Sequence, residues 1–189
     1  MSMSCAPTSP SPWLAAVLAI AGVSALAPAH AHQVWLENAG GQARLHFGEF
    51  NDNLRETSPG RLDQFKGVPL LEQQRTGAPA QRVDGQLGKD AFVYATTGSP
   101  DTLFATPTYP VIDRSKRNLP AMVWQPAARW VASLAKPVAP TAALDLVPTG
   151  KPGELKVVYQ GAPLPKAKVQ LAAPSGWTHA RAACSSWST

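Results

Sequence analysis

Residues 33 to 47 read Gln-Val-Trp-Leu-Glu-Asn-Ala-Gly-Gly-Gln-Ala-Arg-Leu-His-Phe. Apolar and polar residues alternate on both sides of Gly40-Gly41, a pattern typical of strands that bury one face. A glycine pair between two such segments favours a tight turn, so the stretch predicts an antiparallel hairpin. The residues expected on its buried face are Val34, Leu36, Ala43, Leu45 and Phe47.

The same pattern continues along the chain, whose 19 Pro and 14 Gly separate short segments. We therefore expect an all-β fold. Ser58-Pro59, followed by Leu62 and Phe65 before Gly67, predicts one short helix. The segment 129–134 could form a strand or a helix, because periodicity does not distinguish them over so short a run. The further predicted strands are 80–83, 91–96, 122–125, 129–134, 142–147, 154–159 and 167–171.

Four parts of the chain differ in composition. Residues 1–31 are predicted to be a signal peptide, and residues 32–134 an N-terminal β-sandwich domain. Residues 135–141, Ala-Lys-Pro-Val-Ala-Pro-Thr, are expected to form an extended linker. Residues 142–189 contain three short strands where an immunoglobulin-like sandwich needs roughly seven, so we expect an incomplete domain of that type. From about residue 178 the sequence is small and polar without alternation, which indicates an anomalous tail.

The signal peptide is predicted from an apolar run at residues 13–27, which is short for a bilayer span, in a segment of 31 residues without Lys, Arg, Asp or Glu. Small residues allow cleavage after Ala29 or after Ala31. We favour cleavage after Ala31, which would make His32 the first residue. The mature chain is then expected in the periplasm, without a membrane span of its own.

Charge, cysteine content and motifs exclude several classes of protein. The net charge is +5, but the basic residues are scattered and the densest group is 114–117, which we interpret as a solvated turn rather than a nucleic-acid site. Only Cys184 would remain after cleavage, so no disulfide within the chain is expected. The motifs His-Glu-x-x-His, Gly-x-Ser-x-Gly and Cys-x-x-Cys are absent, which argues against an enzyme.

The sequence Ala29-His30-Ala31-His32 at the predicted cleavage site indicates a metal ligand. If His32 is the first residue, its amine and its imidazole can chelate one ion. If His30 is the first residue, the amine, two amides and the His32 imidazole can form the square plane that Cu(II) and Ni(II) favour. The α-amino pKa of about 7.7 to 8.0 makes a deprotonated amine accessible near neutral pH. The alternative interpretation is a solvated chain terminus without a metal.

His46 and Glu49 are the candidates for additional metal ligands. We expect His46 on the outward, exposed face of the second hairpin strand. Positions three apart in a strand point to opposite faces, so His46 and Glu49 can share one ion only if Gly48 bulges or ends the strand. The segment Asn51-Asp52-Asn53 lacks the spacing of a calcium loop and is interpreted as a turn.

Four segments together resemble one protein family: residues 31–37, 45–49, 144–148 and 161–169. They are similar to a family of domains of unknown function described as NikM-like periplasmic components of cobalt and nickel transport. The resemblance implies an exported protein with an N-terminal β-sandwich, a second immunoglobulin-like domain and a metal-related role. Members of the family continue with further strands past Gly176-Trp177, where this sequence instead has residues 180–189.

The resulting hypothesis is an exported, non-enzymatic protein that binds Ni, Co or Cu through His32, His30, His46 and Glu49 during uptake or handling of the metal. A membrane transporter or an outer-membrane receptor is the expected protein partner. Two other functions stay open. One is an immunoglobulin-like interaction module without a metal, and the other is a copper monooxygenase, which would need a second histidine beside the first.

Overall fold

The computed structural model describes residues 32–167 and residue 169. The predicted signal peptide, His30, the tail from about residue 178 and most of the predicted strand 167–171 lie outside the described residues.

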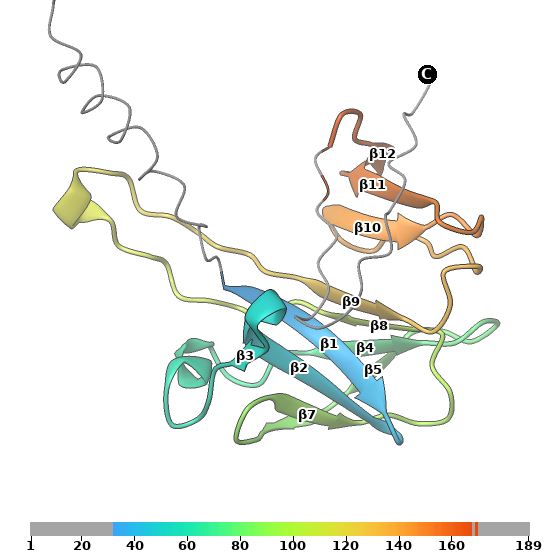
Figure 1. The fold of residues 1–189 in the computed structure, drawn as a ribbon, viewed down its shortest axis with the longest axis horizontal. Coiled ribbons are helices and arrows are strands. Elements are labelled where there is room, and N and C mark those ends of the chain that lie inside the picture. Colours follow the sequence, from blue (N-terminus) through green and yellow to red (C-terminus); the bar gives the residue numbers. More distant parts are fainter. Residues whose placement is uncertain (1–31, 168, 170–189) are drawn as a thin grey trace, which may run out of the picture. The chain divides into compact units, whose positions relative to one another are not determined.

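The described residues confirm the all-β fold, with antiparallel strands and only short 3-10 helices (Figure 1). None of these helices reaches the length and apolar character that a membrane crossing requires. The strands are β1 (Gln33–Ala39), β2 (Gln42–Glu49), β3 (Leu54–Arg55), β4 (Leu71–Gln74), β5 (Gln81–Val83), β6 (Gly85–Leu87), β7 (Phe92–Ala95), β8 (Thr102–Ala105), β9 (Ala128–Val131), β10 (Leu144–Pro148), β11 (Leu155–Tyr159) and β12 (Ala162–Pro163).

The predicted hairpin is confirmed as β1 and β2, which pair from Gln33 opposite Gly48 to Ala39 opposite Gln42. Gly40 and Gly41 form the turn with φ of 60° and 76°, values that L side chains rarely adopt. Strand β2 also pairs with β7 and β3, and β7 pairs with β6. These five strands form the first sheet.

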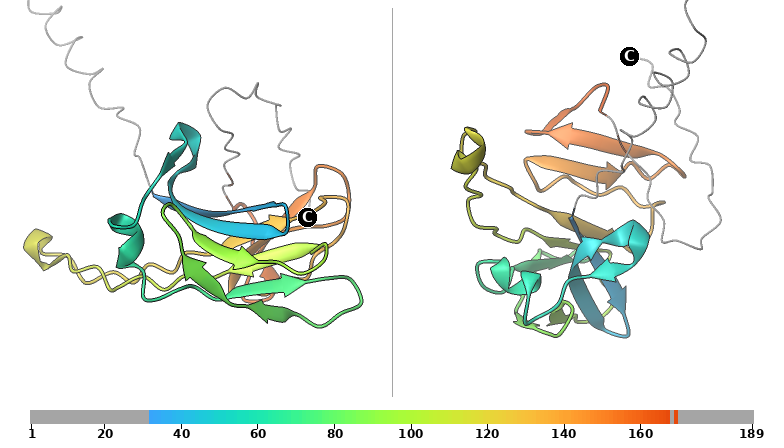
Figure 2. Two further views of the ribbon diagram at one scale, coloured as in Figure 1. Left: turned by 90° about the horizontal axis from the view of Figure 1, so that it is seen from below. Right: turned by 60° about the vertical axis from the view of Figure 1, so that its left-hand side comes forward.

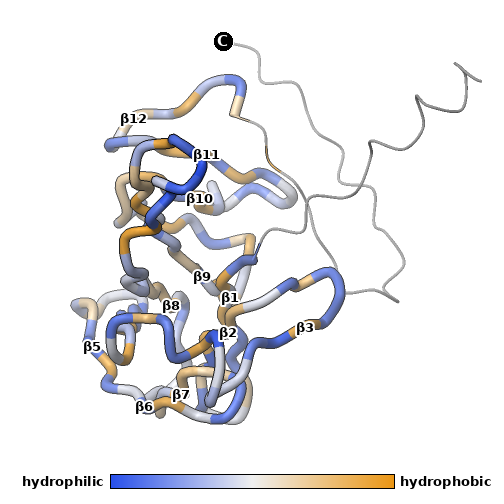
Figure 3. The backbone as a smooth tube through the Cα atoms, turned by 90° about the vertical axis from the view of Figure 1, so that its left-hand side faces the viewer, coloured by the Kyte–Doolittle hydropathy of each residue, from blue (hydrophilic) through white to orange (hydrophobic). Residues whose placement is uncertain are grey.

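The second sheet has the order β5-β4-β8-β9 and packs on the first across one hydrophobic core. Figure 2 shows the two layers from two sides, and Figure 3 shows hydrophobic residues alternating with hydrophilic ones along the strands. The alternation explains the packing, since every second side chain of a strand points into the core. The core includes Leu36, Ala43, Leu45, Phe47, Leu62, Phe65, Leu71, Phe92, Tyr94, Leu103, Ala105 and Ala128.

A third sheet has the order β10-β11-β12, after a segment 135–141 that contains no strand. Arg129 of β9 makes a two-pronged ion pair with Asp145 of β10, with Nε to Oδ1 at 3.0 Å and Nη2 to Oδ2 at 2.6 Å. Leu144, Leu146 and Tyr159 are exposed on one face of this sheet.

Two predictions differ from the structure. The predicted strand 122–125 is wrong, since only Met122 pairs there, in a single bridge to Ile112. Trp124 instead packs against the core. The short helix is η2 (Arg61–Gln64), a 3-10 helix that begins after Gly60 and not at Ser58-Pro59. Two further 3-10 helices are η1 (Phe50–Asp52) and η3 (Ser115–Arg117). The segment 129–134 contains a strand, β9, and no helix.

Candidate functional site

The hairpin places His32 and His46 on opposite faces of the first sheet. Trp35 lies opposite His46 in the β1–β2 register, and the two rings stack with centroids 5.3 Å apart. The His32 ring instead contacts the core residue Phe47, with centroids 5.0 Å apart. Phe47 and His46 are neighbours in β2, and neighbouring residues in a strand point to opposite faces. The His32 imidazole, on the side of Phe47, is therefore separated from the His46 imidazole by the sheet. The expected shared site of His32 and His46 is therefore not formed.

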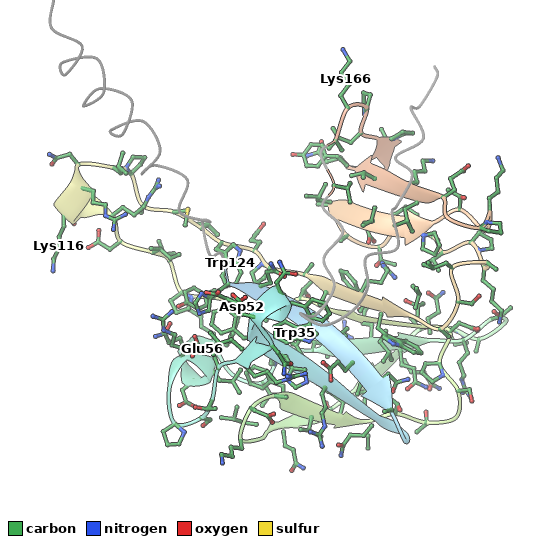
Figure 4. All side chains as sticks on the ribbon, in the orientation of Figure 1. Trp35, Asp52, Glu56, Lys116, Trp124 and Lys166 are labelled. Carbon is green, nitrogen blue, oxygen red and sulfur yellow. The ribbon has the colours of Figure 1, made fainter. Side chains whose placement is uncertain are left out.

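His32 lies just before β1 between two carboxylates. Its Nε2 atom is 2.6 Å from Glu56 Oε1, and its Nδ1 atom is 3.8 Å from Glu49 Oε1. The three side chains are largely shielded from solvent, with exposed fractions of 23% for His32, 15% for Glu49 and 19% for Glu56. Glu56 and Trp124 are labelled at this end of the sandwich in Figure 4.

The contact with Glu56 places a proton on Nε2 of His32. A carboxylate only accepts hydrogen bonds, so Nε2–H donates to Glu56, and Nδ1 is the ring nitrogen left for a metal. Arg61 Nη1 lies 3.1 Å from the same Nε2. Arg61 Nη1 and His32 Nε2 are then both donors, so they do not hydrogen-bond to each other. We interpret the Arg61 guanidinium as a charge partner of Glu56, whose Oε1 is 3.8 Å from Arg61 Nε. Metal-binding histidines commonly have this arrangement, with a carboxylate on the nitrogen that does not bind the ion.

Gly48 allows β3 to bring Glu56 to this position. A Cβ atom at Gly48 would lie 2.1 Å from the Leu54 carbonyl oxygen, and the φ of 150° also favours glycine. The close approach lets Gly48 pair with Arg55, and the Glu56 amide donates to the Phe47 carbonyl at 2.8 Å. Gly48 remains within β2, so the strand neither bulges nor ends there, and His46 and Glu49 do not share a site.

His46 is buried, with only 2% of its surface exposed, so the expectation of an exposed residue is wrong. The reason is Trp35, which covers its ring on the face of the sheet that points away from the core. Its Nδ1 lies 3.0 Å from the backbone carbonyl of Asp90, and its Nε2 lies 3.4 Å from Glu37 Oε2. Burial lowers the pKa of His46, although the Asp90 carbonyl and the charge of Glu37 oppose this shift.

Glu37 is held by two donors on its other oxygen. Arg55 Nη2 donates to Oε1 at 2.8 Å, and the Trp35 indole Nε1 donates to the same atom at 3.1 Å. Burial raises the pKa of Glu37, but these hydrogen bonds and the nearby His46 and Arg55 outweigh it and lower the pKa overall. Glu37 is therefore ionised at neutral pH.

The residues 32–167 and 169 contain no group of three or more His, Cys, Asp or Glu side chains that could hold a metal ion. A metal at His32 would therefore need a ligand that is not a side chain, such as a chain-terminal amine. Residues 51–53 form the expected turn, since η1 ends at Asp52 and Asn53 adopts a left-handed conformation with φ 52°.

The sequence interpretation missed Glu37, Glu56 and Arg61. A signal for Glu37 was present, because the Gly40-Gly41 turn sets the hairpin register and places Glu37 diagonally across from His46. For Glu56 and Arg61 the sequence contains no comparable signal, since they reach His32 only through the pairing of β3 with β2.

Comparisons of the chain with protein-family models, with curated proteins and with solved structures find no match.

Proposed function

We propose that the chain is an exported periplasmic protein that binds Ni, Co or Cu through a mature N-terminal His32 and takes part in uptake or handling of that metal. The observation that carries this proposal is the environment of His32. Glu56 fixes the proton on Nε2, and Nδ1 faces the carboxylate of Glu49.

Cleavage after Ala31 would supply the ligand that the side chains lack. The free amine of His32 and its Nδ1 close a chelate ring on one ion. Glu49 Oε1, at 3.8 Å from Nδ1, lies within the roughly 3 to 4 Å that separates two ligands of a single ion. Amine, imidazole and carboxylate form a three-ligand set that suits borderline ions such as Ni(II), Co(II) and Cu(II).

Cleavage after Ala29 would leave His30 as the first residue and give a different site. The His30 amine, two backbone amides and the His32 imidazole then supply four nitrogens in a plane, which favours Cu(II) and Ni(II). Nδ1 of His32 is the ligand atom in both geometries, and Glu56 engages the other ring nitrogen.

The copper monooxygenase hypothesis loses its main support. A histidine brace needs a second imidazole beside the first, and His46 lies on the opposite face of the sheet. We therefore propose a binding protein and not an enzyme. A membrane transporter or an outer-membrane receptor would deliver or receive the ion.

A non-catalytic interaction module is the second candidate function. The exposed apolar side chains of β10 and β11 favour it, since contiguous exposed apolar surface is typical of interaction sites. This function would not need a metal, so metal binding separates the two candidates.

Mass spectrometry of the exported protein, combined with calorimetric titration by Ni(II) and Cu(II), tests the proposal. We expect a mature N-terminus at His32 and a loss of affinity of at least tenfold in His32→Ala. Glu49→Gln should also weaken binding, whereas Glu154→Gln, a carboxylate beside β11, serves as the matched control and should not. Equal affinities in wild type and His32→Ala would reject the proposal and favour the interaction module.

A further inference from the structure

His46 has one buried nitrogen without a hydrogen-bond partner among the described residues. The atom is Nε2, on a side chain that is 98% shielded, and it points toward Glu37. Leaving a buried polar atom without a hydrogen-bond partner is destabilising, so its presence in a side chain this well packed calls for a physical explanation.

The other nitrogen of His46 shows why Nε2 lacks a partner. The Asp90 carbonyl can only accept a hydrogen bond, so Nδ1, at 3.0 Å from it, carries the proton. In the neutral ring Nε2 then presents a lone pair. Glu37 Oε2, at 3.4 Å, also presents lone pairs, so the two atoms facing each other are both acceptors.

Both side chains are held so that these acceptors stay in place. Trp35 stacks on the His46 ring and the Asp90 carbonyl fixes its rotation. Arg55 and Trp35 hold Oε1 of Glu37, which orients Oε2 toward His46. Hydrogen bonds to the atoms that do not bind the ion are the usual support of metal ligands.

The distance between the two acceptors fits a bound ion. Two ligands about 2.1 Å from a tetrahedral Zn²⁺ lie about 3.4 Å apart, and 3.4 Å is the separation of His46 Nε2 and Glu37 Oε2. We propose that these two atoms form a second metal site, which binds a divalent transition ion such as Zn²⁺ on the outer face of the β1–β2 hairpin. Water would complete the coordination, and the ion would enter past Glu37, whose side chain is 44% exposed.

This site is independent of the one proposed at His32, which lies on the other face of the sheet. It can therefore be tested in a protein that lacks the first site. We would use the mature chain carrying His32→Ala, labelled with ¹⁵N, and titrate it with Zn²⁺ alone. Histidine ring ¹⁵N shifts and calorimetry would be the two readouts.

We expect His46 to show a protonated Nδ1 and an unprotonated Nε2 before Zn²⁺ is added, and its Nε2 resonance to move as Zn²⁺ binds. Glu37→Gln in the same background should weaken Zn²⁺ binding at least tenfold, because loss of even an outer-shell partner costs 10- to 100-fold. Glu154→Gln should leave it unchanged.

Glu37 is half-exposed, so Glu37→Gln is expected to fold, and circular dichroism would check this. An Nε2 resonance that does not move with Zn²⁺, or Zn²⁺ affinity that survives Glu37→Gln, would overturn the proposal. If His32→Ala left the Ni(II) affinity unchanged, that result would count only against the N-terminal site. The site proposed at His46 and Glu37 would not be affected by it.

Discussion

His46 is buried on the outward face of β2 because one aromatic residue, Trp35, covers it. A strand pattern of period two predicts which face a residue occupies, but not whether a neighbour covers that face. His32, at the end of the neighbouring strand, is directed to the core side by its contact with Phe47. The two histidines thus have separate partners, and any metal chemistry of one proceeds without the other.

Glu56 offers the most direct test of the His32 environment at the level of a single residue. Its carboxylate accepts the Nε2 proton at 2.6 Å, which leaves Nδ1 available to a metal. We expect Glu56→Gln to lower the Cu(II) affinity of the mature protein by roughly 10- to 100-fold, as for other outer-shell partners. Calorimetric titration measures the effect.

Glu72→Gln, on β4 of the second sheet, is the matched control for this change. A Glu56→Gln protein that binds Cu(II) as tightly as wild type would show that the contact with His32 has no role in metal binding.

Strand elements with clear alternation were predictable, and those without it were not. The hairpin of β1 and β2 follows from its alternation and its two glycines. Strand β4, Leu71–Gln74, was missed because the buried residue Gln73 is polar. Its side-chain amide donates to the Thr97 carbonyl at 2.6 Å, and a sequence pattern does not show such a hydrogen bond. Strand β8, Thr102–Ala105, was missed because it is buried at three of four positions and does not alternate.

A buried ion pair joins Arg129 of β9 to Asp145 of β10, and its loss should lower the free energy of unfolding. The two side chains are 7% and 3% exposed. Removing one partner of a buried pair costs about 3 to 5 kcal/mol, because the other charge stays buried alone. We expect Asp145→Asn to lower the free energy of unfolding by about 3 kcal/mol at pH 7, measured by urea denaturation, with the exposed Asp84→Asn as control.

The same pair predicts the acid sensitivity of the protein. Burial raises the pKa of Asp145, but Arg129 and the backbone amides of Thr141 and Ala142 outweigh it and hold the pKa below its usual range. The stabilisation is therefore present above the unfolded pKa of about 3.9 and is lost as the pH falls through the lower folded pKa. Urea denaturation from pH 7 to pH 3 should show this loss in wild type and a smaller one in Asp145→Asn. An equal loss in both proteins would contradict this assignment.

At the scale of the whole molecule, the described residues combine a two-sheet sandwich with a third sheet of three strands. One face of β10 and β11 carries Leu144, Leu146, Val157 and Tyr159, all at least partly exposed, and the opposite face carries the buried Val147 and Val158. The sequence predicted these two strands, because both alternate. It did not indicate which face is buried, since the buried face also carries the charged residues Asp145 and Lys156.

This difference between the faces predicts an unusual order of mutational effects. Val147 is 3% exposed and Leu146 is 38% exposed. Val147→Ala should lower the free energy of unfolding by about 2 kcal/mol, from the lost methyl groups and the cavity that remains. Leu146→Ala removes more atoms but should lower the free energy of unfolding by less. Thermal or urea denaturation measures both changes. A larger loss for Leu146→Ala would show that the exposed face is covered in solution.

The central claim, that a free amine on His32 binds a metal together with its imidazole, is tested most directly by blocking that amine. Two proteins would be prepared, both beginning at His32, one with a free amine and one acetylated on it, so that every side chain is the same. Cu(II) titration should show at least tenfold tighter binding for the protein with the free amine, because only it offers the amine and Nδ1 of one residue to the ion. Equal affinities would contradict the claim, since the side chains alone would then account for all binding.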